Sequence, residues 1–303
     1  MRLSKALKIE NVGLAAYNFG GIGFMLTRIL NSVVAVMVLL PVLFFSDTVV
    51  FPIAIAVVSV ICLYEIFKCT GFYKRLDLVA PIYFVAIVTP FLIRYWKDGE
   101  EVAQIAFIAA AVYFIYLLAR IVWSHGRIPF SDGISLYALS LYIIVALSSI
   151  LYVRDFKDGG EYIYLLIFIG AWVTDIFAYF TGYFIGKHKL IEDVSPKKTI
   201  EGSIGGIILC SASFVMFGLI VDACFNGNAN WLFLLIAGII ISIISQIGDL
   251  IMSVLKRHYK IKDFGKIFPG HGGMLDRFDS ILAVSLGLCA ICMFASVSGI
   301  SLI

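Results

Sequence analysis

The sequence of 303 residues is 61% hydrophobic and only 14% charged, with a mean hydropathy of +1.01 and a formal net charge of +3. Since soluble domains carry about 25% charged residues, this composition predicts an integral membrane protein and excludes an ordinary soluble domain. The small net charge and the lack of a basic tail also argue against nucleic acid as a partner.

The first 24 residues differ from the rest of the chain. They carry Arg2, Lys5 and Lys8, and we interpret them as an N-terminal extension on the membrane surface. The first strongly apolar run begins near Ile29, and no small-residue cleavage site follows it, so a retained span is expected rather than a signal peptide. Residues 25–303 are expected to form a single transmembrane domain.

Long apolar runs then follow one another to the C-terminus. A helix crosses the bilayer core with about 17–25 mostly apolar residues. Nine runs satisfy this rule, at residues 29–45, 48–67, 77–93, 102–123, 132–153, 162–186, 204–223, 231–255 and 279–301. The links between them are short, so the sequence predicts an all-α, polytopic membrane protein with about nine transmembrane helices.

Lysine and arginine are unequally distributed between the two sides that these spans create. Of the 23 such residues, 19 fall on the side of the N-terminus, and the other four are Arg94, Lys97, Arg154 and Lys157. Because positively charged loops stay in the cytoplasm, we predict a cytoplasmic N-terminus and cytoplasmic loops near residues 187–198 and 256–277.

Two spans carry polar residues in helical register. In span 162–186, Asp175, Tyr179, Gly182 and Gly186 share one helix face. An aspartate inside a span costs about 2.5–3.5 kcal/mol on insertion scales and therefore indicates function. The alternative is helix–helix packing, which Gly182-x-x-x-Gly186 also fits.

The second stripe lies in span 231–255 and runs toward the cytoplasmic side. It consists of Ser242, Gln246, Asp249, Ser253 and Lys256. Ser242 and Gln246 are typical of hydrogen bonds between helices. Asp249 is the stronger functional candidate, since an aspartate is an expensive way to join two helices.

The loop between spans 162–186 and 204–223 contains "SPKKTIEGSIGG". Ser195 followed by Pro196 predicts a helix N-cap with proline in the first turn. Lys197, Lys198 and then Ser203 follow, and lysines beside free backbone N–H groups at a helix start favour an anion site. The alternative for the two lysines is their ordinary role in membrane topology.

The last polar loop and the start of span 279–301 combine acidic, basic and glycine residues around His271. They are Asp263, Asp276 and Asp279; Lys256, Arg257, Lys260, Lys262, Lys266 and Arg277; and Gly270, Gly272 and Gly273. Carboxylates with open coordination positions suit Mg²⁺ bound to a phosphate, and the glycines and basic groups suit that phosphate. Asp279 fits a helix cap equally well, and His271, lacking a second histidine, is interpreted as a hydrogen-bond donor to phosphate. The residues thus predict an intramembrane, cytoplasm-facing site for a metal-bound phosphate.

The run "SVLKRHYKIKDFGKIFPGHGGMLDRFD", residues 253–279, resembles the signature of the phosphatidate cytidylyltransferases, or CDP-diacylglycerol synthases. The segments "SPKKTIEGSIGG" (195–206), "DIFAYFTG" (175–182) and "LTRIL" (26–30) also resemble that family. The resemblance covers the chain from about residue 25. It implies a multi-span helical enzyme, a homodimer, that joins CTP to phosphatidic acid and releases pyrophosphate and CDP-diacylglycerol with the help of Mg²⁺.

Carried onto this sequence, the resemblance implies catalytic roles for Asp249, Asp276, Lys256 and Arg257. Asp249, Asp276 and Asp175 are the expected ligands of Mg²⁺ and of any second cation. The residues expected to bind the two substrates are Ser195, Lys197, Lys198, Ser203, Lys262, Asp263, His271, Gly272, Gly273, Arg277 and Asp279. The enzyme would lie in the inner, cytoplasmic membrane of the cell with its active site facing the cytoplasm.

The chemistry fits these residue types. A phosphate monoester has a second pKa of about 6, so the attacking phosphate is already an anion and needs no strong general base. Positioning and charge neutralisation remain as the protein's task. The alternatives are a related CTP-using transferase acting on another lipid phosphate or a lipid alcohol, and an ion-coupled transporter with intramembrane aspartates.

Overall fold

The computed structural model describes residue 34 and residues 37–96, 98–157, 159–225, 227–268, 272–299 and 302. The predicted surface segment 1–24, the segment 26–30, the N-terminus and His271 lie outside these residues. Most of the predicted first span, 29–45, also lies outside them, although its residues 37–44 are described and helical.

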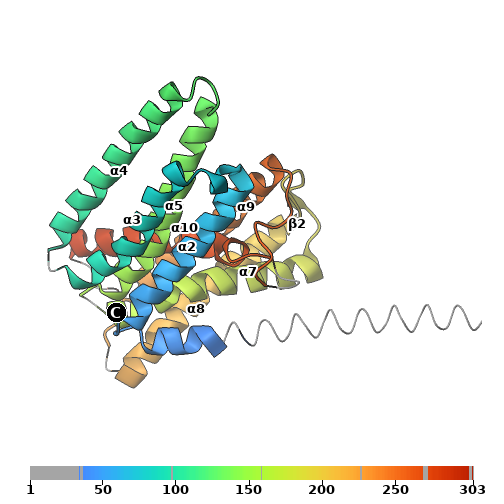
Figure 1. Cartoon of the computed structure of the whole chain (residues 1–303). Helices are drawn as coiled ribbons and strands as arrows, with labels where there is room; N and C mark the ends of the chain where they lie inside the picture. Colours follow the sequence, from blue (N-terminus) through green and yellow to red (C-terminus); the bar gives the residue numbers. More distant parts are fainter. Residues whose placement is uncertain are drawn as a thin grey trace, which may run out of the picture.

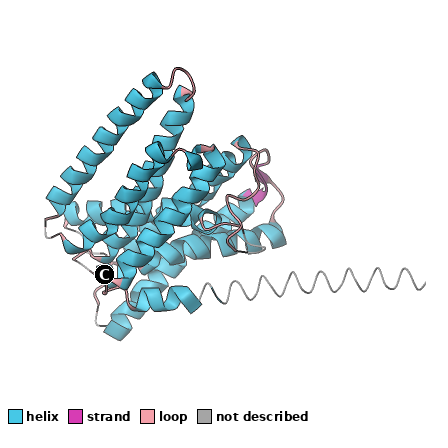
Figure 2. Cartoon of the chain, in the orientation of Figure 1, coloured by secondary structure: helices cyan, strands magenta, loops and turns pink. Residues whose placement is uncertain are grey.

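Helices dominate the described chain (Figure 1), and two short strands form the only sheet seen there (Figure 2). Eight segments, with α6 and α7 taken together, are long and apolar enough to cross a membrane. They match the eight spans predicted after residue 47 to within four residues at each end, which confirms an all-α, polytopic membrane fold. The elements are α2 (Val50–Thr70), η1 (Phe72–Lys74), α3 (Leu76–Tyr95), α4 (Gly99–Trp123), α5 (Phe130–Arg154), α6 (Gly160–Ile163), α7 (Leu165–Ile185), β1 (Lys189–Ile191), β2 (Ser195–Thr199), α8 (Ile200–Phe225), α9 (Trp231–His258) and α10 (Leu275–Ser298).

Several helix ends follow from local sequence. The Asp98 side chain caps α4 by accepting the N–H of Glu100 at 2.8 Å, and Asn230 caps α9 by accepting the N–H of Phe233 at 3.1 Å. Helix α2 ends at Gly71, whose φ of +82° is a left-handed conformation that glycine adopts without steric penalty.

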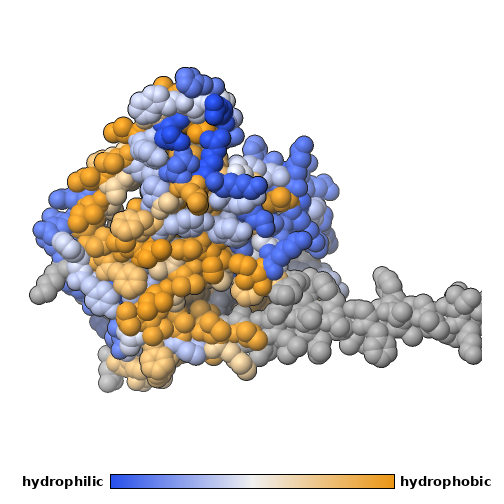
Figure 3. Space-filling model, in the orientation of Figure 1, coloured by the Kyte–Doolittle hydropathy of each residue, from blue (hydrophilic) through white to orange (hydrophobic). Residues whose placement is uncertain are grey.

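Helix α10 lies at the centre of the bundle, where it packs against α2, α5, α7 and α9. Helix α4 lies at the periphery (Figure 1). All of its residues are described, and among them Leu117 alone is buried. The molecular face in Figure 3 is largely apolar, with hydrophilic residues gathered at the α4–α5 turn and around the β hairpin. An apolar flank with polar ends suits a protein embedded in lipid.

Glycines bring α7 and α8 close together, which agrees with the alternative interpretation of Gly182-x-x-x-Gly186 as a helix-packing pattern. A Cβ atom on Gly182 would lie 2.7 Å from Thr199 Oγ1 and 3.6 Å from Gly202 Cα. A Cβ atom on Gly202 would lie 2.5 Å from the carbonyl oxygen of Ala178. Any larger residue at these positions would force the helices apart.

The prediction that Ser195 caps a helix with Pro196 in its first turn is wrong. Residues Ser195–Thr199 form β2, which pairs with β1 in an antiparallel hairpin, and α8 begins only at Ile200. Thr199 is the cap instead, because its Oγ1 accepts the N–H of Gly202 at 3.2 Å. The Glu201 carboxylate also accepts the backbone N–H groups of Lys187 and His188, which ties the hairpin to the first turn of α8.

At the end of the bundle away from the hairpin, Asp155 joins α3 to α5. It forms ion pairs with Arg94 and, at 3.2 Å, with Arg154, and Arg94 also donates to the carbonyl of Ser46 at 2.9 Å. Burial raises the pKa of Asp155, and the two guanidinium groups oppose that rise. Asp155 is therefore shared by both basic groups, and it balances one of their two positive charges.

We predict that Gly202→Ala lowers the free energy of unfolding by about 1–3 kcal/mol, because the added methyl group overlaps the backbone of α7. The measurement is thermal unfolding of the purified protein in detergent. Gly99→Ala is the matched control, since a Cβ atom there meets nothing within 4 Å. Equal unfolding temperatures for the two variants would contradict the close α7–α8 packing.

Candidate active site

Three helices bring aspartates together where α7, α9 and α10 cross. Asp175 of α7 accepts a hydrogen bond from Ser280 Oγ at 2.9 Å, and the backbone N–H of Ser280 donates to Asp279 Oδ1 at the same distance. Asp249 of α9 lies close enough to both Asp175 and Asp279 to interact with them electrostatically. Its neighbour Gly248 allows this approach, because a Cβ atom there would lie 3.3 Å from the Asp279 carbonyl oxygen.

Two lysines are paired with these carboxylates. Lys198 Nζ of β2 lies 2.6 Å from Asp249 Oδ2. Lys256 Nζ of α9 lies 3.0 Å from Asp276 Oδ1 and 3.9 Å from Asp279 Oδ2. With Asp175, the cluster holds four carboxyl groups against two ammonium groups, so carboxyl groups outnumber the basic groups paired with them.

Asp276 is the most enclosed of the four aspartates, with its side chain only 3% exposed. Besides Lys256, it accepts the backbone N–H groups of Phe264 at 2.8 Å and of Gly273 at 2.9 Å. It therefore joins the loop after α9 to the first turn of α10. Asp279 does not cap this helix, because it lies in the second turn of α10 and not at its start.

Glu65 of α2 also holds this loop, and we did not anticipate it from the sequence. Its Oε1 accepts the N–H of Met274 at 3.0 Å, and its Oε2 accepts the N–H of Leu275 at 2.8 Å. The signal in the sequence was a single glutamate inside an apolar run, in the predicted span 48–67. The rule that ionisable residues in a span are functional candidates would have marked it.

The donor set is compatible with Mg²⁺ but does not form a closed cage. Within the described residues, no three carboxylate, thiol or imidazole groups converge at metal-binding distance. Mg²⁺ commonly keeps several waters and takes only one or two carboxylates together with substrate phosphates. A carboxylate has about four acceptor positions, of which Asp276 uses three, whereas Lys198 is the one described partner of Asp249.

The other predicted site residues are placed less centrally. Lys197, Arg257, Lys262, Asp263 and Arg277 are exposed, and none forms an ion pair with another described residue. Ser195 and Ser203 are half-buried.

The glycines of the loop have internal roles in the structure. Gly273 N–H donates to Asp276, and Gly272 adopts a φ of +85° and accepts the N–H of Phe268 at 2.9 Å. These two backbone groups are thus engaged within the protein.

Two residues of the α9 stripe join helices, as their interpretation as interhelical contacts predicted. Thr174 Oγ1 of α7 donates to Ser242 Oγ at 3.0 Å, and Gln246 Nε2 donates to the Ser203 carbonyl of α8 at 3.3 Å. The stripe therefore divides into packing contacts deep in the bundle and charged groups at the end nearer the β hairpin.

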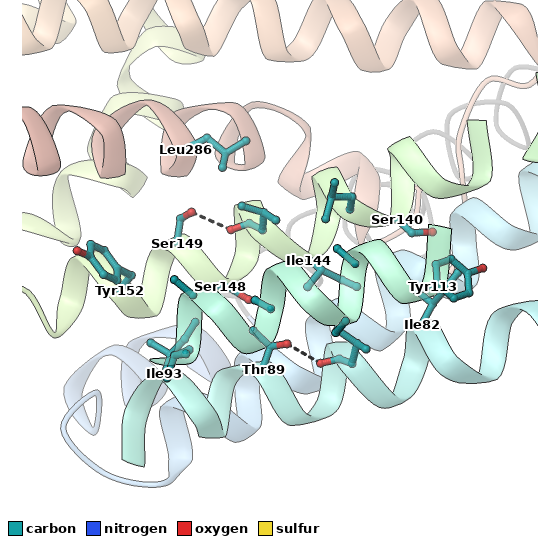
Figure 4. A pocket seen from close by; sticks show the side chains of 18 of the residues that line it. Ile82, Thr89, Ile93, Tyr113, Ser140, Ile144, Ser148, Ser149, Tyr152 and Leu286 are labelled. Atoms are coloured by element: carbon teal, nitrogen blue, oxygen red, sulfur yellow. Dashed lines mark hydrogen bonds between the residues drawn. The ribbon is translucent and has the colours of Figure 1, made fainter. Parts of the chain in front are cut away.

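An apolar groove of about 890 Å³ lies away from these carboxylates, between α3, α4, α5 and α10. Figure 4 shows Ile82, Ile144 and Leu286 on its walls. The hydroxyls of Thr89 and Ser149 turn back onto their own helices, with bonds of 2.7 Å to the carbonyls of Val85 and Val145. The groove is therefore suited to apolar groups.

Comparison with known proteins bears on this arrangement. The model of the cytidylyltransferase family matches residues 26–295, nearly the whole described chain. The chain belongs to the cytidylyltransferase family. It is therefore an enzyme, a nucleotidyltransferase that spans the membrane several times.

Three bacterial relatives carry the name phosphatidate cytidylyltransferase. The protein from Staphylococcus haemolyticus is 36% identical over 261 residues, and those from Staphylococcus aureus and Staphylococcus epidermidis are 34% and 33% identical over 260 residues. Each alignment covers 86% of this chain and 96% of the relative. The match to the family model, at residues 26–295, includes all eight described spans up to Ala295 and both polar loops.

We predict that Asp276→Ala speeds hydrogen exchange at the backbone amides of residues 264 and 273 by about tenfold or more. Each amide loses a buried acceptor, a change that costs about 1–3 kcal/mol. Exchange followed by mass spectrometry measures this, with the exposed Asp263→Ala as control. Unchanged exchange in Asp276→Ala would show that the carboxylate does not hold the loop.

Proposed function

We propose that this cytidylyltransferase joins CTP to phosphatidic acid, forming CDP-diacylglycerol and pyrophosphate for phospholipid synthesis. The observation that carries the proposal is the cluster of four aspartates and two lysines from α7, β2, α9 and α10. The names of the three staphylococcal relatives support phosphatidate as the acceptor.

In the proposed reaction, an oxygen of the phosphatidate phosphate attacks the α-phosphorus of CTP. A new P–O bond forms, the bond from the α-phosphorus to the bridging oxygen breaks, and pyrophosphate leaves with the electron pair. The attacking phosphate is already an anion above its second pKa of about 6, so no side chain has to remove a proton. Positioning and charge neutralisation carry the rate enhancement.

The chain's own residues divide between shaping the site and binding anions. Lys198 and Lys256 hold Asp249 and Asp276 in place through ion pairs of 2.6 and 3.0 Å. The basic groups at the same end of the bundle would bind the triphosphate and the lipid phosphate and stabilise the departing pyrophosphate. They are the exposed Lys197, Arg257, Lys262 and Arg277.

Asp249 and Asp276, together with Asp175, are the residues we propose to hold Mg²⁺ and any second cation. The excess of carboxyl groups over paired basic groups in the cluster supports this assignment, and Asp249 has more acceptor positions open than Asp276. When bound, Mg²⁺ would neutralise phosphate charge and bring the two substrates together.

The active site is proposed to face the cytoplasm, with the enzyme in the cell membrane. The distribution of lysine and arginine supports this orientation. A site at the membrane surface also suits a reaction between a soluble nucleotide and a lipid headgroup.

We also propose that the enzyme is a homodimer that associates through α4. This helix buries only Leu117 within its own described chain. Ala103, Ala106 and Ala110 line the apolar groove and would allow a helix of a second copy to approach closely.

Purified protein in mixed micelles of phosphatidic acid is expected to transfer the label from α-³²P CTP, but not from γ-³²P CTP, to lipid. The reaction should stop in excess EDTA and resume with Mg²⁺. Diacylglycerol replaces phosphatidic acid in a parallel reaction that tests a lipid alcohol as acceptor. Absence of labelled CDP-diacylglycerol, or transfer from the γ-phosphate to the alcohol, would overturn the proposed acceptor.

Asp249→Asn serves as the matched variant in this assay, because it keeps the side chain's size and removes its charge. We expect turnover to fall by about 10²–10³-fold while the protein still inserts and unfolds at a similar temperature. A near-normal rate would remove Asp249 from the site.

The wild-type protein is expected to have the mass of two chains when light scattering is corrected for detergent. Ala106→Trp should reduce this mass to one chain by filling the groove face of α4. Val122→Trp is the control, because Val122 is exposed on α4 but does not line the groove. A monomeric wild type, or an Ala106→Trp variant that remains dimeric, would refute association through this face.

A further inference from the structure

We propose that Glu65 of α2 is a positioning residue for the reaction, because its carboxylate sets where α10 begins and so where Asp276 and Asp279 lie. This inference rests on the proposed function, since it assigns a role in the same active site. Glu65 belongs to α2, which packs mainly against α3, α5 and α10. The aspartate cluster is formed by other helices, α7, α9 and α10.

Both carboxylate oxygens of Glu65 are used in the contact with α10. Glu65 is only 2% exposed, and each of its oxygens accepts one backbone N–H, from Met274 at 3.0 Å and from Leu275 at 2.8 Å. These N–H groups belong to the start of α10, which has no capping side chain of its own at Met274. Glu65 therefore acts as the N-cap of a helix more than 200 residues away in sequence, and its negative charge also favours the positive end of that helix.

Two glycines of the loop make room for this carboxylate. A Cβ atom on Gly265 or on Gly273 would overlap Glu65 Oε1. The same Cβ atoms would lie 2.7 Å and 2.5 Å from Glu65 Cδ, so a rotation of the carboxylate alone would not remove the overlap. The Glu65 carboxylate is thus packed against both Gly265 and Gly273 of the loop.

The two buried carboxylates hold successive backbone groups. Asp276 accepts the N–H of Gly273, and Glu65 accepts the next two, from Met274 and Leu275. Asp276 is the following residue, and its other oxygen receives Lys256 Nζ. If Glu65 released α10, this turn would shift and carry Asp276 and Asp279 with it. A displacement of about 1 Å in a reacting constellation can reduce a rate 10²-fold.

Among the described residues, Glu65 has no hydrogen-bond partner other than these amides, and none of its bonds reaches Asp175, Asp249 or Asp279. Glu65 is therefore assigned to positioning and not to contact with substrate. A purely structural residue would change the amount of folded enzyme. A positioning residue changes the turnover of the enzyme that is folded.

The test measures kcat and KM for CTP in Glu65→Gln, Gly265→Ala and the control Ser59→Ala. Ser59 is also buried on α2, at 2% exposure, but it donates only to the Ile55 carbonyl of its own helix. We expect kcat per folded molecule to fall about 10–100-fold in the first two variants with KM changed less than about threefold. Ser59→Ala should retain wild-type kcat.

Thermal unfolding of Glu65→Ala, Gly265→Ala and their double variant supplies a readout that does not depend on activity. Gly265→Ala should lower the unfolding temperature of the wild type more than that of Glu65→Ala, because the overlapping carboxylate is gone and only the Gly273 Cα, at 3.1 Å, remains close. If the wild type were inactive on phosphatidic acid while this coupling was present, the proposed function would fail but the Glu65 contact would stand.

The positioning role would be overturned by additive unfolding temperatures, or by folded Glu65→Gln and Gly265→Ala proteins whose kcat equals that of Ser59→Ala. It would also be overturned if every Glu65 and Gly265 variant failed to fold, since the residue would then serve stability alone.

Discussion

Inside a bilayer no water is available to satisfy a backbone N–H group or a charge, so every buried polar group must find its partner within the protein. The candidate active site is organised by this constraint. Glu65 and Asp276 between them accept four backbone N–H groups of the loop and of the first turn of α10, and Lys256 neutralises Asp276. The loop is therefore held by carboxylates from two helices as well as by its own backbone.

The same pairing links the architecture of the bundle to its chemistry. Ser280 joins Asp175 to Asp279, and Lys198 brings the hairpin onto Asp249. Ionisable side chains that would be costly in lipid thus lie together, at the place where a triphosphate and a divalent cation are proposed to bind and to neutralise them. The bundle is closely packed where α7, α8 and α9 meet through glycines and the Thr174–Ser242 bond, and the charged residues lie beyond that contact.

Much of the fold was predictable, because hydropathy over some 20 residues reports directly on burial in lipid. The eight described spans followed from hydropathy, and the interhelical roles of Ser242 and Gln246 followed from their residue types. The glycine pattern of α7 indicated helix packing only as an alternative and did not name α8 as the neighbour. The cap at Ser195 was misplaced, because strand pairing with Lys189–Ile191 outweighs a local capping pattern. Asp279 could be read as a cap only because the start of α10 was placed four residues too late.

The sequence by itself determined the class of protein, the positions of the spans and the identity of the signature residues, because composition, helical period and motif are local properties of the chain. Only the tertiary structure decided which of those residues meet. Glu65 and Leu275 are 210 positions apart, and no local pattern relates them. The division between Asp276, which is enclosed by loop amides, and Asp249, which keeps open acceptor positions, likewise depends on how α2, α9 and α10 pack.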